Sequence, residues 1–173
     1  MKYVICLWLT LVAGLDLSTA GDKIELRWKT LDSTTYAEAK KGEKKILVDV
    51  YTNWCGWCKR LDRDVYGNER IASYLDQRYV LVKINAESDS KVKYMDTTYT
   101  ESGFAQALGV TGYPTIVFFD SDSKPITILG GYVGPEKFLP IAKFIGEDHY
   151  KKSSWDDFKK EYDASEKVGK GGK

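Results

Sequence analysis

Cys55 and Cys58 are the residues of this chain whose type and spacing most directly imply chemistry. They stand two residues apart, directly after the apolar run 46–51 and at the expected start of a helix. The amide donors and positive potential of a helix N-terminus favour a thiolate at Cys55. Cys58 lies one turn into the helix, where it can attack a mixed disulfide and release the product. The pattern predicts a redox-active pair and a thiol–disulfide oxidoreductase.

Other uses of this pair find little support in the sequence. The third cysteine, Cys6, lies in a segment that we expect to be removed, and the only histidine, His149, lies far along the chain. We therefore expect neither a four-ligand zinc site nor a copper or zinc carrier completed by a nearby Met or His. A structural disulfide is the alternative, but so short a loop constrains the unfolded chain little.

The N-terminus has the pattern of a secretory signal peptide. Basic Lys2 precedes an apolar run over residues 3–15, and small residues follow at Ser18 and Ala20. We expect cleavage after Ala20, which gives a signal peptide at residues 1–20 and a protein that is periplasmic or secreted. The apolar run is short for a membrane span, and an uncleaved anchor is the alternative.

Charge and length restrict the class of protein further. The formal net charge is +1, and removing residues 1–20 takes away Lys2 and Asp16, which leaves it at +1. That charge gives no electrostatic footprint for nucleic acid. We expect one domain over residues 21–165, followed by a disordered Gly- and Lys-rich tail over residues 166–173. The balanced charge and the lack of heptads give no reason to expect more than a monomer.

The apolar pattern predicts an α/β fold with a central mixed β-sheet flanked by helices. Strands are expected at residues 24–28, 46–51, 79–85, 115–120 and 126–129. Helices are expected at residues 33–41, 55–65, 69–76, 101–108, 136–145 and, as an extra C-terminal helix, 155–162. Residues 86–100 are polar and are expected to be irregular. The strand from residue 79 should run parallel to the strand before the cysteines, with a right-handed crossover.

Two segments resemble a known family. Residues 46–59, with both cysteines, resemble the active-site segment of thioredoxins, and residues 109–119 resemble their cis-proline segment. Both motifs in this order are strongly specific, and the resemblance covers about residues 44–145. It implies a thioredoxin fold with an extra C-terminal helix. The signal peptide, that helix and Trp57 look more like secreted members such as the SoxW-type proteins and the thioredoxin-like domain of DsbD.

The resemblance assigns catalytic roles to four residues. Cys55 matches the nucleophile and Cys58 matches the resolving thiol. Asp49 matches the buried acid beneath the disulfide, where burial raises its pKa and lets it exchange a proton with Cys58 near neutral pH. Lys83 matches the lysine beside that acid, although a solvated strand end is an equal alternative for it.

The resemblance also assigns a substrate-binding surface. Pro114 matches the cis-proline beside the disulfide, and the backbone of Tyr113 would hydrogen-bond an extended substrate segment. Trp54 would form part of a hydrophobic rim around Cys55, with a packed core aromatic as its alternative. Trp57 departs from the proline of thioredoxin and adds exposed aromatic surface, and Tyr113 replaces a smaller apolar residue. Residues 86–100 are read as a tolerated surface insertion or a specificity loop.

Together these expectations predict a protein that reduces the disulfide bonds of other proteins. It needs no bound cofactor or metal, and a membrane or soluble redox partner would recycle its oxidised pair. No histidine stands between Cys55 and Cys58, and Asp49 disfavours a permanent thiolate, which favours a reductase over a disulfide oxidase or isomerase. A second hypothesis is a non-catalytic protein-binding module that keeps the pair closed.

Overall fold

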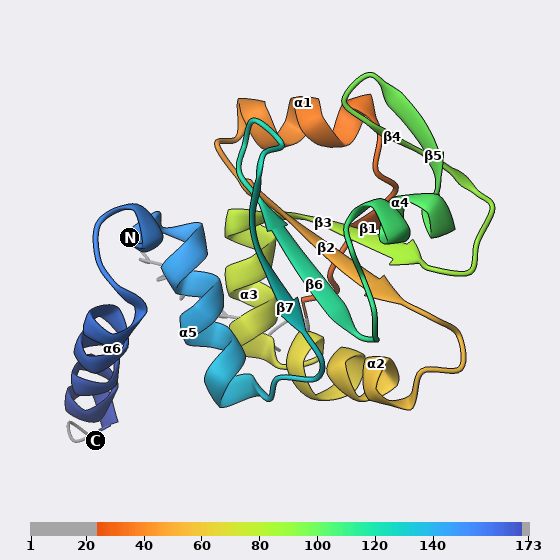
Figure 1. The fold of residues 1–173 in the computed structure, drawn as a ribbon. Coiled ribbons are helices and arrows are strands. Elements are labelled where there is room, and N and C mark those ends of the chain that lie inside the picture. The colour runs from red at the N-terminus through yellow and green to blue at the C-terminus, as the bar shows by residue number, and fades with distance from the viewer. Residues whose placement is uncertain (1–23, 171–173) are drawn as a thin grey trace, which may run out of the picture.

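A five-stranded mixed sheet forms the centre of the computed structural model, which describes residues 24–170 (Figure 1). Its strands, in spatial order, are β1 Trp28–Lys29, β3 Tyr79–Asn85, β2 Lys45–Tyr51, β6 Thr115–Phe119 and β7 Pro125–Gly130. Strands β1, β3 and β2 are parallel, while β6 is antiparallel to both of its neighbours. The predicted parallel pairing around the cysteine motif is confirmed. The predicted signal peptide lies outside the described residues.

Helices cover both faces of this sheet. They are α1 Ser33–Lys41, α2 Gly56–Leu61, α3 Glu69–Arg78, α4 Glu101–Ala107, α5 Pro135–Gly146 and α6 Trp155–Lys170. One hydrophobic core joins the sheet to α2, α3 and α5, and a second core joins the opposite face to α1 and α4. Asn68 and Asp32 cap α3 and α1 with their side chains, as the sequence predicts for such residues.

Strand β2 divides its side chains between the two cores. Ile46, Val48 and Val50 belong to the core beside α1 and α4, whereas Leu47 belongs to the core beside α2 and α3. Because side chains alternate along a strand, Asp49 points to the same side as Leu47. The order of the strand therefore places this acid beneath the helix that carries the cysteines.

The cysteine helix widens after one and a half turns. The α-helical part ends at Leu61 and continues as a π-helical turn, η1 Asp62–Tyr66, in which the Gly67 N–H donates to the carbonyl of Asp62 at 2.9 Å. A Cβ at Gly67 would lie 2.5 Å from the carbonyl oxygen of Arg63, so glycine permits this close turn. The predicted helix 55–65 thus exists, but its second half is π-helical.

Residues 86–100 are a correction to the sequence prediction. They form a β-hairpin of β4 Lys91–Tyr94 and β5 Thr97–Thr100 instead of an irregular loop. Val92 is buried, and the Lys93 N–H donates to the carbonyl of Leu31 at 2.9 Å. Polar and apolar residues alternate along β4, which is a pattern typical of a strand. The polar composition of the whole segment makes this pattern hard to recognise.

Both ends of the described chain also differ from expectation. Strand β1 is only Trp28–Lys29, because these two residues pair with β3 and residues 24–27 do not. Helix α6 was expected at residues 155–162 with disorder from residue 166, whereas it continues to Lys170. Its first turns pack on α5 through Phe158 and Phe144, whose ring centroids lie 5.1 Å apart.

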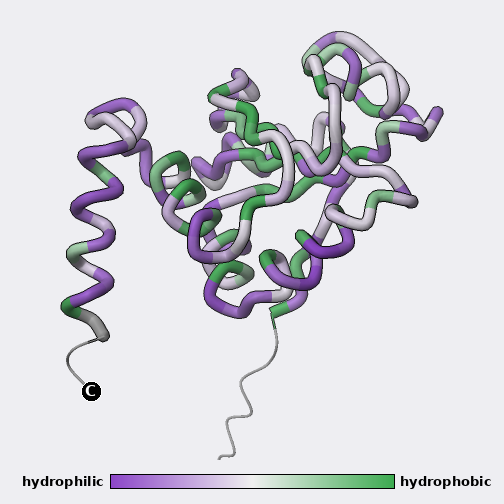
Figure 2. Tube along the Cα trace, turned by 60° about the horizontal axis from the view of Figure 1, so that its bottom comes forward, coloured by the Kyte–Doolittle hydropathy of each residue, from purple (hydrophilic) through white to green (hydrophobic). Residues whose placement is uncertain are grey.

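Hydropathy differs between α6 and the central sheet. Figure 2 shows α6 as mostly hydrophilic along its length, in contrast to the hydrophobic strands at the centre of the molecule. Over residues 24–170, the length and apolar character that a membrane crossing requires occur together in none of the helices.

Candidate active site around Cys55 and Cys58

Cys55 and Cys58 form a disulfide at the start of α2. Cys55 is the N-cap residue of this helix, and its Sγ accepts a hydrogen bond from the Cys58 N–H at 3.0 Å. Each cysteine is only 4% exposed. The amide and the helix N-terminus therefore point at Cys55 Sγ, where they stabilise negative charge when the disulfide is opened.

Asp49 lies buried behind this pair. Its side chain is 1% exposed, and among the described residues its Oδ1 has no hydrogen-bond partner. Burial raises the pKa of Asp49 to about 7, because the ammonium group of Lys83 offsets only part of the desolvation and the carboxylate of Asp62 adds to it. The expected burial of Asp49 is confirmed, and this acid can gain or lose a proton near neutral pH.

Lys83 reaches the same place from β3. It is the register partner of Asp49, and its Nζ lies 3.6 Å from Asp49 Oδ2. The same Nζ lies 2.5 Å from Oδ1 of Asp62 and 4.9 Å from the ring centroid of Trp28. Lys83 therefore lies beside the acid, as the resemblance implies, but its closer partner is Asp62. Sequence reasoning missed Asp62, although it follows Cys58 by about one helical turn.

An aromatic pair borders the disulfide on one side. Trp54 is 67% exposed, so it is a surface aromatic and not a core residue. Its indole N–H donates to Oε1 of Glu87 at 2.9 Å, and its ring stands edge-on to Tyr113 with centroids 6.0 Å apart. The Tyr113–Pro114 peptide bond is cis, as the resemblance implies. Glu87 comes from the segment that the sequence suggested was an insertion.

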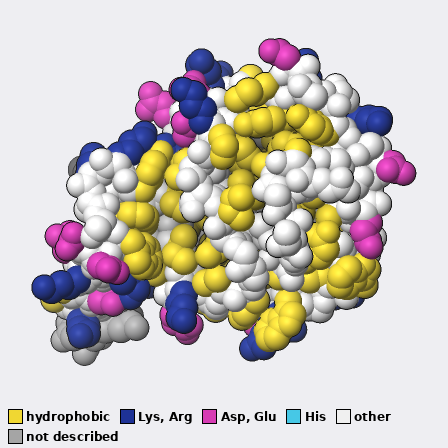
Figure 3. Space-filling view, in the orientation of Figure 1, with side chains coloured by type: hydrophobic (Ala, Val, Ile, Leu, Met, Phe, Trp, Pro, Cys, Tyr) yellow, Lys and Arg dark blue, Asp and Glu magenta, His cyan; other side chains and the backbone are white. Residues whose placement is uncertain are grey.

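A second aromatic pair borders the other side. Trp57 is 54% exposed and packs on Tyr132, with ring centroids 5.4 Å apart. The guanidinium of Arg60 lies over both rings, at 5.3 and 5.1 Å from their centroids. Asp64 accepts hydrogen bonds from the Arg60 Nε–H and the Tyr132 hydroxyl at 3.1 and 3.2 Å. Figure 3 shows hydrophobic side chains next to Lys or Arg side chains at the surface in this region of α2.

The sheet explains why these residues meet. Strand β2 leads into the cysteines, Lys83 pairs in register with Asp49, and Thr115 of β6 pairs with Val50, which brings the preceding Pro114 to the same end of β2. That end gathers all eight residues expected from the sequence: Cys55, Cys58, Asp49, Lys83, Trp54, Trp57, Tyr113 and Pro114. The sequence analysis did not single out Arg60, Glu87 and Tyr132. Only the fold brings these residues into contact with Trp54 and Trp57.

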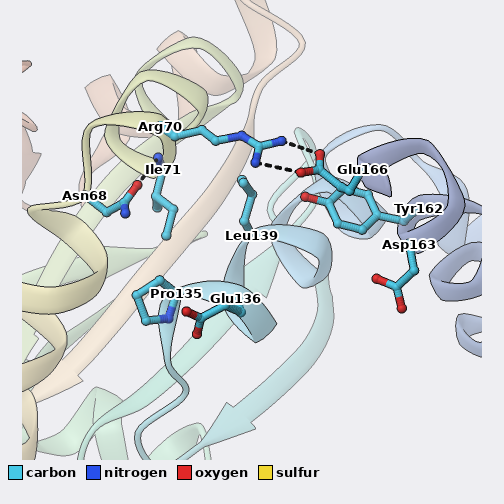
Figure 4. Close-up of a pocket in the computed structure, with 9 residues that line it drawn as sticks. All are labelled: Asn68, Arg70, Ile71, Pro135, Glu136, Leu139, Tyr162, Asp163 and Glu166. Atoms are coloured by element: carbon cyan, nitrogen blue, oxygen red, sulfur yellow. Dashed lines mark hydrogen bonds and ion pairs between the residues drawn. The ribbon is translucent and has the colours of Figure 1, made fainter. Parts of the chain in front are cut away.

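A pocket of about 280 Å³ lies elsewhere, between α3, α5 and α6 (Figure 4). Figure 4 shows Arg70 of α3 reaching Glu166 of α6 through two hydrogen bonds, one of them 2.8 Å long. Tyr162 and Leu139 line the same pocket. The two hydrogen bonds join α6 to α3. None of the residues of the disulfide site lines this pocket.

Comparison with known proteins agrees with this arrangement. Residues 33–146 match the model of a family described as a thioredoxin-like domain. The chain is 36% identical over 119 residues to protein disulfide-isomerase of Oryctolagus cuniculus, which is 68% of this chain and 20% of that protein. It is 26% identical over 111 residues to the thiol:disulfide interchange protein DsbD of Pseudoalteromonas atlantica, which is 63% of this chain and 17% of that protein. The chain spans about a fifth of the length of these curated relatives.

A solved structure extends the similarity to three dimensions. A thioredoxin-fold protein from Helicobacter pylori superposes with a TM-score of 0.58 at 26% sequence identity. The superposition covers 70% of this chain and 81% of that protein. Both sequence and fold therefore point to the same family.

Proposed function

This chain belongs to the thioredoxin-like family, and we propose that it reduces disulfide bonds of client proteins through Cys55 and Cys58. A Cys-x-x-Cys disulfide at a helix N-terminus supports a thiol–disulfide oxidoreductase of the thioredoxin and protein disulfide-isomerase type. The direction of electron flow is the part that we propose.

The reaction begins with the reduced pair. The Cys55 thiolate attacks one sulfur of a client disulfide, forms a mixed disulfide and expels the other client sulfur as a thiolate, which takes a proton from solvent. Cys58 then loses its proton to Asp49 and attacks Cys55 Sγ. The Cys55–Cys58 disulfide forms, the second client sulfur leaves as a thiolate that takes a proton from solvent, and the client has gained two electrons and two protons.

One observation carries this proposal. The Cys58 N–H donates to Cys55 Sγ at 3.0 Å, and Asp49, on the face of β2 that packs against α2, has an Oδ1 with no hydrogen-bond partner among the described residues. The first feature supports a nucleophilic thiolate, and the second supplies a base with a pKa of about 7 for the resolving thiol.

The surroundings of the pair support reduction over oxidation. A strong oxidant needs a thiolate that is heavily stabilised in the reduced state. Here the residues between the cysteines are uncharged, and two acids, buried Asp49 and partly exposed Asp62, both lie beside Lys83. Negative charge on these acids opposes the thiolate, so the reduced pair gives up its electrons more readily.

We also propose the compartment in which the protein works, its clients and its redox partner. We place it in the periplasm or outside the cell, after loss of residues 1–20, acting as a monomer. Its clients are disulfide-containing proteins whose extended segment lies between Trp54 and Trp57. A membrane or soluble redox partner returns electrons to the oxidised pair, since such a compartment is oxidising.

An insulin assay tests the activity. The protein should accelerate the reduction of insulin disulfides by dithiothreitol, and Cys55→Ser should reduce the rate to the uncatalysed level. Cys58→Ser keeps the nucleophile and should accumulate a mixed disulfide with insulin. A protein that only binds clients would not accelerate insulin reduction, and its Cys58→Ser variant would not form a mixed disulfide with insulin.

Isomerisation is the second candidate, favoured by the 36% identity to protein disulfide-isomerase. Refolding of a scrambled disulfide protein without added reductant distinguishes it. An isomerase restores the native pairing under these conditions, while a reductase stops after one turnover of its own dithiol.

A further inference from the structure

Lys83 lies between two carboxylates and contacts them unequally. Its Nζ is 2.5 Å from Asp62 Oδ1 but 3.6 Å from Asp49 Oδ2, which is longer than a hydrogen bond. The ring centroids of Trp28 and Tyr51 lie 4.9 and 5.2 Å from the same Nζ. These rings and Asp62 surround the ammonium group, which stays beyond hydrogen-bond distance of Asp49.

An open groove of about 560 Å³ leads from solvent to this point. Asp62 and Lys83 line it together with Trp28 and Tyr66. The exposed fractions of the three charged side chains fall along the way inward, from 45% for Asp62 to 22% for Lys83 and 1% for Asp49. Asp62 is therefore the carboxylate that lines the groove, and Asp49 lies buried beyond Lys83.

Few other charges face Asp49. From η1 it faces Asp62 and the hydroxyl of Tyr66, and from β3 it faces Lys83. Burial, with Asp49 and Asp62 nearby, raises the pKa of Tyr66 well above its usual value of 10, so this hydroxyl stays neutral. Glu25 lines the groove farther out.

Two oxygens at the inner end are left without partners. Asp49 Oδ1 and the Tyr66 hydroxyl are both buried, and neither has a hydrogen-bond partner among the described residues. Such groups are costly to bury and are usually paired, so their persistence here needs a reason. An acid that must accept a proton during turnover, and return it toward the groove, supplies that reason.

We infer that Asp62 is a positioning residue for the exchange reaction, because it holds Lys83 toward the groove and leaves Asp49 underpaired. Through this contact Asp62 sets how strongly Asp49 binds the proton that Cys58 releases. The proton passes from the Cys58 thiol to the Asp49 carboxylate and then to solvent along the groove. The last step rests on the proposed function, whereas the contact between the three side chains does not.

The test is a titration that needs no turnover. In the oxidised full chain, the carboxyl carbon of Asp49 is followed by NMR against pH, with Asp49→Asn identifying the signal. Asp62→Asn should lower the pKa of Asp49 by about one unit, a tenfold change, because Lys83 is freed to approach and one negative charge is lost. Asp122→Asn, which removes an exposed carboxylate at the β6–β7 turn, should leave the titration unchanged. An unchanged titration in Asp62→Asn overturns the inference.

A double variant separates positioning from simple charge. In a Lys83→Met background, Asp62→Asn should shift the titration of Asp49 by less than half as much as in the wild type. Equal shifts in both backgrounds would show that Asp62 acts as a bare charge, which contradicts a positioning role. Asp62→Glu should restore the wild-type titration, which guards against a general folding defect.

The two proposals fail in different ways. Loss of insulin reduction in Cys55→Ser depends only on the proposed function, and the Asp49 titration depends only on the contacts around Lys83. A wild-type protein that reduces nothing but shows the Asp62-dependent titration would retain the control of Asp49 by Asp62 through Lys83 and would remove the proposed function.

Discussion

Strand β2 buries two charged side chains at its opposite ends, and their surroundings differ. Lys45, at the start of the strand, is 5% exposed, and its Nζ lies 2.8 Å from Asp148 Oδ1. Lys151 approaches the same oxygen to 2.9 Å. Asp49, near the disulfide, is 1% exposed, and its nearest cation is 3.6 Å away and is held by another acid.

The consequences for ionisation are opposite. Burial alone would raise the pKa of Asp148, but contact with Lys45 and Lys151 outweighs it and lowers that pKa below 3.8. At Asp49 burial prevails, and its pKa rises to about 7. One end of β2 therefore carries a fixed ion pair at neutral pH, and the other carries an acid that titrates. A carboxylate in close contact with two ammonium groups holds structure, whereas a buried carboxyl whose nearest cation lies 3.6 Å away is suited to moving a proton.

The largest effect is expected from Asp49→Asn. A carboxyl whose pKa is raised on folding binds protons more tightly in the folded state, so its stability contribution falls as pH rises from about 4 to 7. At about 1.4 kcal/mol per pKa unit, the variant should gain roughly 4 kcal/mol at pH 9. The gain at pH 5 should be smaller by about 3 kcal/mol. Denaturant unfolding of the oxidised protein at both pH values measures this, and equal gains would contradict an ionisable Asp49.

Lys45→Met should have the next largest effect, with the opposite sign. Methionine fills a similar volume but leaves Asp148 without its buried partner, and we expect a loss of about 2 kcal/mol at pH 7. The loss stays below the usual value for a broken buried pair because the Asp148 side chain is 36% exposed and can be hydrated. The same unfolding experiment reports it. A change smaller than 0.5 kcal/mol (about the effect of an ordinary surface substitution) would mean that this end is not held by the pair.

The smallest effect is expected from Asp148→Asn. A carboxyl with a lowered folded pKa stabilises the protein above its unfolded pKa, and this contribution is lost as pH falls through the folded pKa. The variant should therefore be less stable at pH 7 by about 0.5 kcal/mol, after allowance for solvent screening, and should match the wild type near pH 2. Asparagine tolerates the left-handed conformation of this residue, whose φ is 59°. A pH-independent loss would point to geometry and not to charge.

The redox centre was largely predictable because its signals are local. Cys55 and Cys58 follow a buried strand, and the apolar neighbours of Asp49 indicated its burial. The place of Lys83 beside Asp49 was implied by the resemblance to thioredoxins, and the register of β2 and β3 in the structure explains it. Sequence patterns over a few residues suffice for such features.

The missed features depend on geometry that only the folded chain supplies. The contact of Asp62 with Lys83 occurs at the start of a π-helical turn, and the Lys45–Asp148 pair needs a left-handed residue just after α5. Glu87 reaches Trp54 across 33 residues of sequence. Polar composition also concealed the hairpin at residues 91–100, because only one of its side chains, Val92, is fully buried.

The reduction potential of the Cys55–Cys58 pair tests the central claim most directly. Equilibration of the full chain in defined thiol–disulfide buffers at pH 7, followed by quantification of the reduced fraction, gives the value. The account predicts a potential near or below about −220 mV, in the range of thioredoxin and glutaredoxins. A potential above about −150 mV would approach that of strong oxidants and would show that the protein makes disulfides instead of reducing them.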